Sequence, residues 1–212
     1  MIAIGFTRRA LLRGAWVVLL SGPAGGFVAR AQAAGPIAPI EQLQQGLLQV
    51  MRQGKATPFA QRASGLTPIV QRVFDLPAIL RVSVGPAWFR LTPDEQGRLL
   101  NVFQQYTVAT YVQAFDSYDG QRFVVSPQTR SLAGGTQVVH TQIIPRSGET
   151  HTIDYVMRRA PDGAWKATDV LADGTISRVA VQRSDFSAML AQGGAAALEA
   201  SLQRKTAMLA RG

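Results

Sequence analysis

Few side chains in this sequence combine the types and the spacing that catalysis or metal binding requires. The two histidines, His140 and His151, fall in neighbouring segments predicted as strands, without any cysteine or H-E-x-x-H pattern. The G-x-S-x-G, P-loop and G-x-G-x-x-G signatures of acyl transfer, phosphate binding and dinucleotide binding do not occur either. We therefore interpret both histidines as surface or strand-edge residues, and we predict no metal site and no cofactor.

One carboxylate lies in a setting that could change its chemistry. Asp169 alternates with Trp165, Ala167 and Leu171 along a predicted strand, which places it on an apolar face. A buried acid beside an aromatic ring is a candidate general acid or base. The alternative is structural, because a buried carboxylate is usually satisfied by backbone amides or an arginine. The face carries no second acid or base, so we favour the structural interpretation and keep catalysis as the alternative.

The N-terminal part of the chain after residue 35 is predicted to be helical. Apolar residues at helical spacing predict an amphipathic helix over 36–53, ended by Gly54. Thr57-Pro58 and Thr67-Pro68 each predict the start of a separate short helix, and a further helix is predicted over 75–85.

A longer helix follows. Thr92 and Glu95 have the spacing of a capping box, which predicts a helix from Pro93 to about Tyr118. Its apolar residues spread over about half of the helical circumference, wider than the stripe of a surface helix. We therefore expect this helix to be covered on more than one side.

After Asp119 the apolar period changes from helical to alternating, which indicates strands. Four turn sequences divide this region into four or five strand-length pieces: Gly134-Gly135, Arg146-Ser147-Gly148, Pro161-Asp162-Gly163 and Asp173-Gly174. Such short connections join antiparallel neighbours. The sequence thus predicts an α+β fold, with one curved antiparallel sheet packed by helices on one face.

The C-terminal region is predicted to be helical again. Asp185 has the properties of an N-cap for a short helix, and Gly193-Gly194 separates it from a final amphipathic helix. The final helix carries Leu198, Leu202 and Leu209 on one face.

The first 34 residues have the composition of an export signal. They combine arginines and no acid with an apolar stretch and small residues before the end, so we predict cleavage after Ala33 or Ala34. The segment 7–13 also resembles a twin-arginine motif, and the choice between twin-arginine and Sec export stays open. We expect 35–212 to form a single exported domain.

The positive charge of the chain falls largely in this signal. The sequence has 22 Lys+Arg, 13 Asp+Glu and a net charge of +9. Removing the signal, with Arg8, Arg9, Arg13 and Arg30, lowers the net charge to +5 and leaves the basic residues scattered. A basic stripe is therefore lacking, and we expect no nucleic-acid partner.

Several segments in order resemble the toluene-tolerance Ttg2/Mla family of periplasmic lipid carriers. They include Phe74-Asp-Leu-Pro-Ala-Ile-Leu-Arg81, Leu91-Thr-Pro-Asp-Glu-Gln96, Phe103-Gln-Gln-Tyr106, Tyr118-Asp-Gly120, Asp154-Tyr-Val-Met-Arg158, Gly163-Ala-Trp-Lys-Ala-Thr-Asp-Val170 and Asp173-Gly-Thr-Ile-Ser177. The resemblance covers about 37 to 210, and the segments 74–80 and 173–186 are most similar to the hopanoid-biosynthesis-associated branch.

The resemblance implies a fold, a function and partners. The implied fold is an NTF2-like cone with an apolar cavity for a lipid, either a phospholipid or a hopanoid-type lipid. The implied role is that of a soluble auxiliary component of an ABC transport system, which shuttles lipid between the inner and outer membranes. The implied partners are an inner-membrane ABC transporter complex, an outer-membrane lipid-exchange partner and, transiently, the membrane itself. The alternative is an enzyme that uses the same cone with Asp169 as acid or base.

Residue types do not separate a cavity wall from a packed core, because both are aliphatic and aromatic. The candidate lipid-binding residues are Val82, Trp88, Phe89, Phe103, Tyr106, Tyr111, Phe115, Phe123, Val139, Ile143, Tyr155, Met157 and Trp165. Arg81, Arg158 and Arg159 are candidates for headgroup binding or docking, with solvated surface arginines as the alternative.

Overall fold

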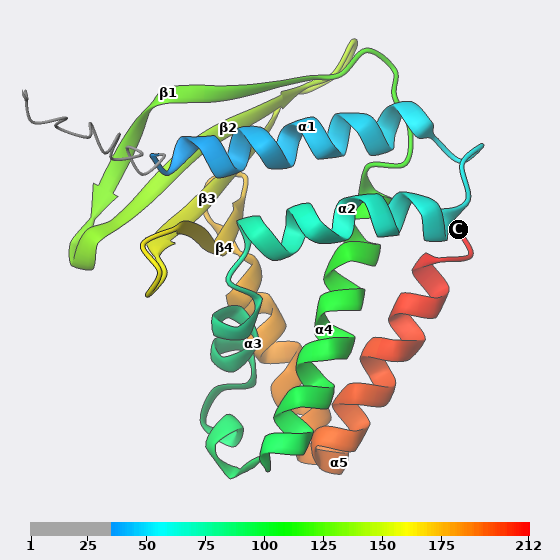
Figure 1. Cartoon of the computed structure of the whole chain (residues 1–212), viewed down its shortest axis with the longest axis vertical. Coiled ribbons are helices and arrows are strands. Elements are labelled where there is room, and N and C mark those ends of the chain that lie inside the picture. Colours follow the sequence, from blue (N-terminus) through cyan, green and yellow to red (C-terminus); the bar gives the residue numbers. More distant parts are fainter. Residues whose placement is uncertain (1–34) are drawn as a thin grey trace, which may run out of the picture. The chain divides into compact units, whose positions relative to one another are not determined.

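A computed structural model describes residues 35–212, and the predicted export signal lies outside them (Figure 1). Its α-helices are α1 (Ile37–Gln53), α2 (Phe59–Val73), α3 (Leu76–Val84), α4 (Pro93–Ala114) and α5 (Arg178–Leu209). Its strands are β1 (Arg122–Leu132), β2 (Thr136–Ile144), β3 (His151–Arg159), β4 (Trp165–Ala172) and β5 (Ile176–Ser177). Short 3-10 helices cover Gly85–Arg90 and Ala133–Gly135.

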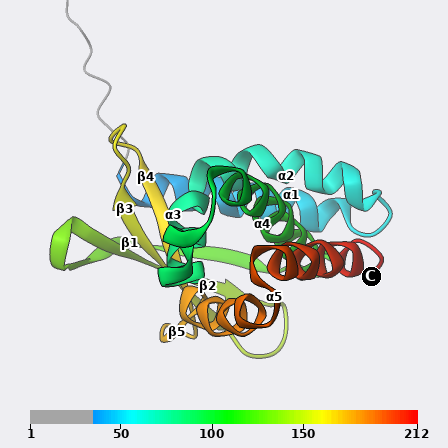
Figure 2. The same ribbon diagram turned by 90° about the horizontal axis from the view of Figure 1, so that it is seen from below.

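The five strands form one antiparallel sheet in sequence order, β1-β2-β3-β4-β5. Val139 pairs with Tyr155, and Tyr155 pairs with Val170, so the central strands share one apolar row. Figures 1 and 2 show the sheet at one end of the helical part, with α1 running along it. The predicted α+β class and the curved antiparallel sheet packed by helices are confirmed.

The helix starts of α3 and α4 follow the predicted caps. The Asp75 carboxylate accepts a hydrogen bond from the Ala78 amide at 3.1 Å. At α4, the Glu95 amide donates to Thr92 Oγ1 at 3.3 Å and the Thr92 amide donates to Glu95 Oε2 at 2.8 Å. These bonds from Thr92 stabilise the carboxylate and lower the pKa of Glu95. The capping box fixes where the long helix begins.

The prediction of two helices around Pro68 is wrong, because α2 continues through it. A proline inside a helix costs about 3 kcal/mol. The apolar stripe of α2 nevertheless runs past Pro68, and Leu66, Val70 and Val73 are all buried. Burial of each such side chain contributes about 1.5–3 kcal/mol, so packing outweighs the proline penalty.

The predicted end of α4 at about Tyr118 is also too late. The helix ends at Ala114, and Phe115 leaves the helical conformation. The buried Arg62 side chain donates to the Val112 carbonyl at 3.4 Å, which satisfies an acceptor of the last turn. Beyond the end, Asp116 forms an ion pair with Lys55 at 3.1 Å. Contacts from α2 and its preceding turn thus determine where the chain turns toward the sheet.

The last helix begins before the predicted cap. The N-cap of α5 is Ser177, whose side chain accepts from the Ala180 amide at 3.0 Å, whereas Asp185 lies within the helix. The predicted break is present, since Gly193 and Gly194 have non-helical backbone angles. Figure 1 shows α5 turning back at this point, so that its second part runs beside α4.

Neither histidine is part of a metal cluster. His140 Nδ1 lies 2.7 Å from Asp154 Oδ1 on neighbouring strands, with the His140 side chain 48% exposed. His151 is exposed at the start of β3. Within residues 35–212, no group of three or more His, Cys, Asp or Glu side chains could hold a metal ion. Nor does any helix of this region have the length and hydropathy needed to cross a membrane.

Candidate functional site

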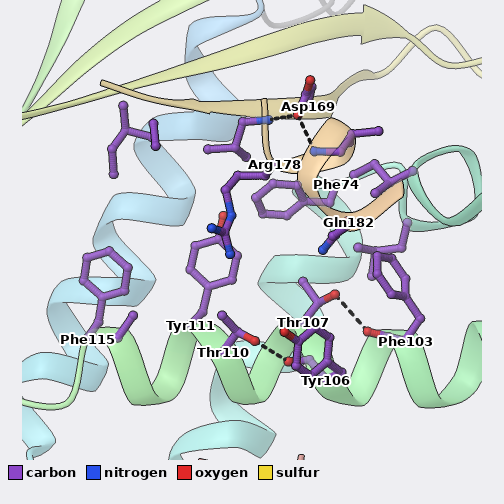
Figure 3. Close-up of a pocket in the computed structure, with 17 residues that line it drawn as sticks. Phe74, Phe103, Tyr106, Thr107, Thr110, Tyr111, Phe115, Asp169, Arg178 and Gln182 are labelled. Carbon is purple, nitrogen blue, oxygen red and sulfur yellow. Dashed lines mark hydrogen bonds between the residues drawn. The ribbon is translucent and has the colours of Figure 1, made fainter. Parts of the chain in front are cut away.

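A cavity of about 280 Å³ lies between α4, the strands β3 and β4, and the first turns of α3 and α5 (Figure 3). Its lining residues are Phe74, Leu76, Ile79, Phe103, Tyr106, Thr107, Thr110, Tyr111, Ala114, Phe115, Ile153, Asp169, Val170, Ala172, Arg178, Val179 and Gln182. Ligand sites of about 300–1,000 Å³ with few polar groups are typical of proteins that bind small apolar molecules. The volume of this cavity is slightly below that range.

One wall of the cavity is a single face of α4. Its residues recur three and four positions apart from Phe103 to Ala114, the spacing that aligns side chains along a helix. The hydroxyls of Thr107 and Thr110 donate to the carbonyls of Phe103 and Tyr106 at 2.8 and 2.9 Å. These hydroxyls are satisfied within the helix, so the wall remains mainly apolar.

Aromatic rings continue this wall toward the sheet. Tyr111 lies with its ring centroid 5.5 Å from Phe74 and 6.1 Å from Phe115, the latter in a stacked pair with an 11° interplanar angle. Phe115 in turn contacts Phe123 of β1 at 5.9 Å. Burial raises the pKa of Tyr111 well above its usual value, so its phenol stays protonated further into the alkaline range than that of an exposed tyrosine.

Asp169 lies at the edge of the cavity but is occupied by structural bonds. Its carboxylate accepts from the amides of Val170 at 2.7 Å and Val179 at 3.1 Å. It also accepts from the hydroxyl of Ser177. Because two of these donors belong to the start of α5, Asp169 ties that helix to β4, and the interpretation that Asp169 holds backbone amides is confirmed.

The first residue of α5 brings a positive charge to this apolar space. Figure 3 shows the Arg178 side chain extending from the helix start toward the ring of Tyr111. The positive charge of Arg178 lowers the pKa of Tyr111, against the larger effect of burial and that of Tyr155. Arg178 is exposed, so the cavity reaches solvent at this point. Neither a hydrogen bond nor an ion pair joins its guanidinium to another residue of the described part of the chain.

Four of the candidate lipid-binding residues line the cavity: Phe103, Tyr106, Tyr111 and Phe115. The other nine do not line this space. Val139, Tyr155 and Met157 are buried in the core, and Phe123, Ile143 and Trp88 are partly buried. Val82 is 49% and Phe89 80% exposed on the surface. Trp165, at the start of β4, is 9% exposed and lies below the guanidinium of Arg159 at 4.7 Å.

The arginine that lines the cavity is none of the three sequence candidates. Arg81 and Arg158 are exposed, and Arg159 donates to the Gly163 carbonyl at 2.9 Å and stacks on Trp165. Sequence reasoning missed Arg178, Gln182 and most of the wall contributed by α3 and β4. The segment 74–81 resembles the lipid carriers, but its spacing alone does not assign Phe74 or Ile79 to a cavity.

Comparisons with known proteins agree with this geometry. The family model described as "MlaC protein" matches residues 41–204. Among solved structures, the chain is similar to a phospholipid-binding protein from Ralstonia solanacearum, determined in complex with a phospholipid. The TM-score is 0.71 at 21% sequence identity, and the match covers 84% of this chain and 99% of the other. At this identity the structural match shows a shared fold.

Proposed function

The chain belongs to the MlaC protein family, and from this premise we propose that it shuttles a phospholipid across the periplasm as the soluble component of an ABC transport system. The observation that carries the proposal is the apolar cavity between α4 and β4, with a single arginine at its opening. The predicted export signal supports a periplasmic location.

Transfer free energy explains why such a carrier needs this cavity. Each methylene group moved from water into an apolar environment contributes about 0.8 kcal/mol. Acyl chains therefore cross an aqueous space only when protein covers them. The aromatic rings of Phe74, Tyr111 and Phe115 supply this apolar surface at the centre of the wall.

The cavity chemistry favours a carrier over an enzyme. Among residues 35–212, Asp169 is the only acid that lines the cavity, and its oxygens already accept three hydrogen bonds. The nearby phenol of Tyr111 is protonated at neutral pH, and burial raises its pKa further. These groups hold the structure together and leave an apolar surface for binding.

Phospholipid is the proposed cargo, in preference to a hopanoid-type lipid. The Ralstonia protein with this fold was determined with a phospholipid bound. In this chain, the charge of Arg178 at the opening fits a lipid whose apolar part ends in an anionic headgroup. The proposed partners are an inner-membrane ABC transporter complex, an outer-membrane lipid-exchange partner and, transiently, the membrane surface.

Native mass spectrometry of protein purified from its own periplasm tests the proposal. We expect the wild-type protein to carry a phospholipid. The Thr110→Phe variant adds a ring inside the cavity and should lose most of this lipid. Gln105→Phe adds the same ring to an exposed position of the same helix and should retain the lipid. Wild-type protein that is recovered without lipid, and that binds none from phospholipid vesicles, would contradict the proposal.

A further inference from the structure

We propose that Arg178 and Gln182 form a binding site for the anionic phosphodiester of the cargo lipid, which makes the carrier select phospholipids against lipids without phosphate. This inference rests on the proposed function and adds its headgroup specificity. The two residues are one turn apart at the start of α5, and both line the cavity.

The guanidinium of Arg178 is available for a ligand. Two ion pairs of Lys or Arg occur among residues 35–212, together with the contact between His140 and Asp154, and Arg178 takes part in none of these. The acid that lines the cavity with it is Asp169. The Asp169 carboxylate already accepts hydrogen bonds from Ser177, Val170 and Val179. A planar guanidinium can form two parallel hydrogen bonds to a phosphate, which a neutral lipid headgroup cannot match in strength.

Gln182 supplies a second donor whose orientation is determined by a neighbour. Its Oε1 accepts a hydrogen bond from the hydroxyl of Ser83 at 3.3 Å, and Ser83 is buried in α3. This bond assigns the oxygen to the α3 side and leaves the Nε2 hydrogens free to donate. In Figure 3 the nitrogen of Gln182 points into the cavity. The phosphate would thus meet donors from both residues.

The start of α5 does not provide the binding donors itself. The Val179 amide donates to Asp169 and the Ala180 amide donates to Ser177 Oγ, so the first turn is already capped. The selectivity therefore depends on the side chains of Arg178 and Gln182. Both can be changed without removing the cap.

Affinities for two lipids with identical acyl chains test the site. Phosphatidylglycerol carries the phosphodiester and diacylglycerol lacks it. We expect the wild-type protein to bind phosphatidylglycerol about 10- to 100-fold more tightly, the range for hydrogen bonds to a charged group. Arg178→Gln should bring the ratio of the two affinities close to one, while the affinity for diacylglycerol stays within about 2-fold of the wild-type value. Arg178→Lys keeps the charge without the planar fork and should restore part of the ratio.

Two further variants separate the site from general electrostatics. Gln182→Glu keeps the acceptor for Ser83 but adds a negative charge, so it should weaken phosphatidylglycerol binding and spare diacylglycerol. Arg183→Gln removes an equal charge from a neighbouring exposed position that does not line the cavity, and should leave the ratio unchanged. An unchanged ratio in Arg178→Gln would overturn the proposal.

Inorganic phosphate separates a lipid site from a general anion site. We expect millimolar phosphate neither to stabilise the protein against heat nor to displace phosphatidylglycerol. Stabilisation by phosphate that disappears in Arg178→Gln, without any lipid discrimination, would overturn the lipid assignment. If the wild-type protein binds both lipids equally, only the proposal of headgroup selection is contradicted. If it binds neither lipid, the proposed carrier function is contradicted as well.

Discussion

The interface between α1 and α2 and the cavity above α4 are lined by the same general class of side chain, yet one is filled and the other is hollow. At the filled interface, Leu43, Leu47 and Leu66 are at most 1% exposed. Gly46 allows a close approach there, since a Cβ at that position would lie 2.6 Å from Ile69 Cδ1. Branched aliphatic residues and a glycine let the two helices interdigitate.

The cavity differs from the α1–α2 interface in the shape of its side chains more than in their polarity. Its α4 wall alternates aromatic rings with threonines, and the stacked pair of Tyr111 and Phe115 presents flat surfaces. On the opposite side, Asp169 and Ser177 fix the start of α5 to β4 through hydrogen bonds. Hydrogen bonds thus hold the elements around the cavity in place. Side-chain packing does not draw these elements together, and the space between them stays open.

The largest effect on stability is expected at the filled interface. Leu47→Ala removes a fully buried side chain and should lower the free energy of unfolding by about 2–5 kcal/mol. Urea unfolding followed by circular dichroism measures this change. A loss below about 1 kcal/mol would mean that the interface is not packed as described.

The hydrogen bonds of Asp169 at the cavity are expected to contribute somewhat less to the free energy of unfolding. Asp169→Asn removes the charge that accepts from Ser177 and Val179 and should cost about 1.5–3 kcal/mol. Lipid loading of the folded protein should persist, because the carboxylate serves the structure. Asp185→Asn, on the exposed side of the same helix, is the control and should change stability by less than about 0.5 kcal/mol. A stable Asp169→Asn protein that loses its cellular function with lipid still bound would revive the enzymatic alternative.

Added volume sharpens the comparison between the two regions. Gly46→Leu forces a larger side chain against Ile69 and should destabilise the fold by about 1–3 kcal/mol. Thr110→Phe adds volume where space exists and should cost less than about 1 kcal/mol, while displacing lipid. Parallel unfolding curves of both variants measure the difference. Equal destabilisation by both would show that the cavity wall cannot take up a larger side chain.

The smallest effect at neutral pH is expected for the phenol of Tyr155, which belongs to the core. Burial raises the pKa of Tyr155 above the value of about 10 that it has in the unfolded chain. The stability due to the neutral phenol is therefore fully present below about pH 10 and is lost as the pH rises further. Tyr155→Phe should change little at pH 7 and should reduce the alkaline loss of stability.

The alkaline loss of stability is measured by thermal unfolding between pH 8 and pH 11. Tyr111→Phe is the matched variant at the cavity. An identical alkaline loss in wild type and in both variants would contradict buried, neutral phenols in this fold.

The sequence predicted most accurately the features that depend on neighbouring residues. The capping box at Thr92, the strand pattern after Asp119 and the break at Gly193-Gly194 are all local and were all found. The continuation of α2 through Pro68 was not predictable, because it depends on burial against other elements. The start of α5 was missed for a similar reason, since Asp169 on another element takes part in fixing it.

The candidate site was predicted only where one helix provides a wall. Phe103, Tyr106 and Tyr111 share a face of α4, which helical spacing reveals. The other walls come from Phe74, Val170 and Arg178, which are brought together only by the sheet and the turn before α5. No periodic pattern in the sequence marks such a junction.

The two edges of the sheet have a consequence for how copies of this protein meet one another. A long, regular edge strand offers free amides and carbonyls to a second sheet and promotes aggregation. Here β1 has a register shift between Val125 and Thr129, with Pro127 inside it lacking an amide hydrogen. At the opposite edge, β5 has only two residues. Strand addition between copies is therefore disfavoured along β1, and at the opposite edge the Asp75 amide already donates to the Ala167 carbonyl of β4 at 2.9 Å.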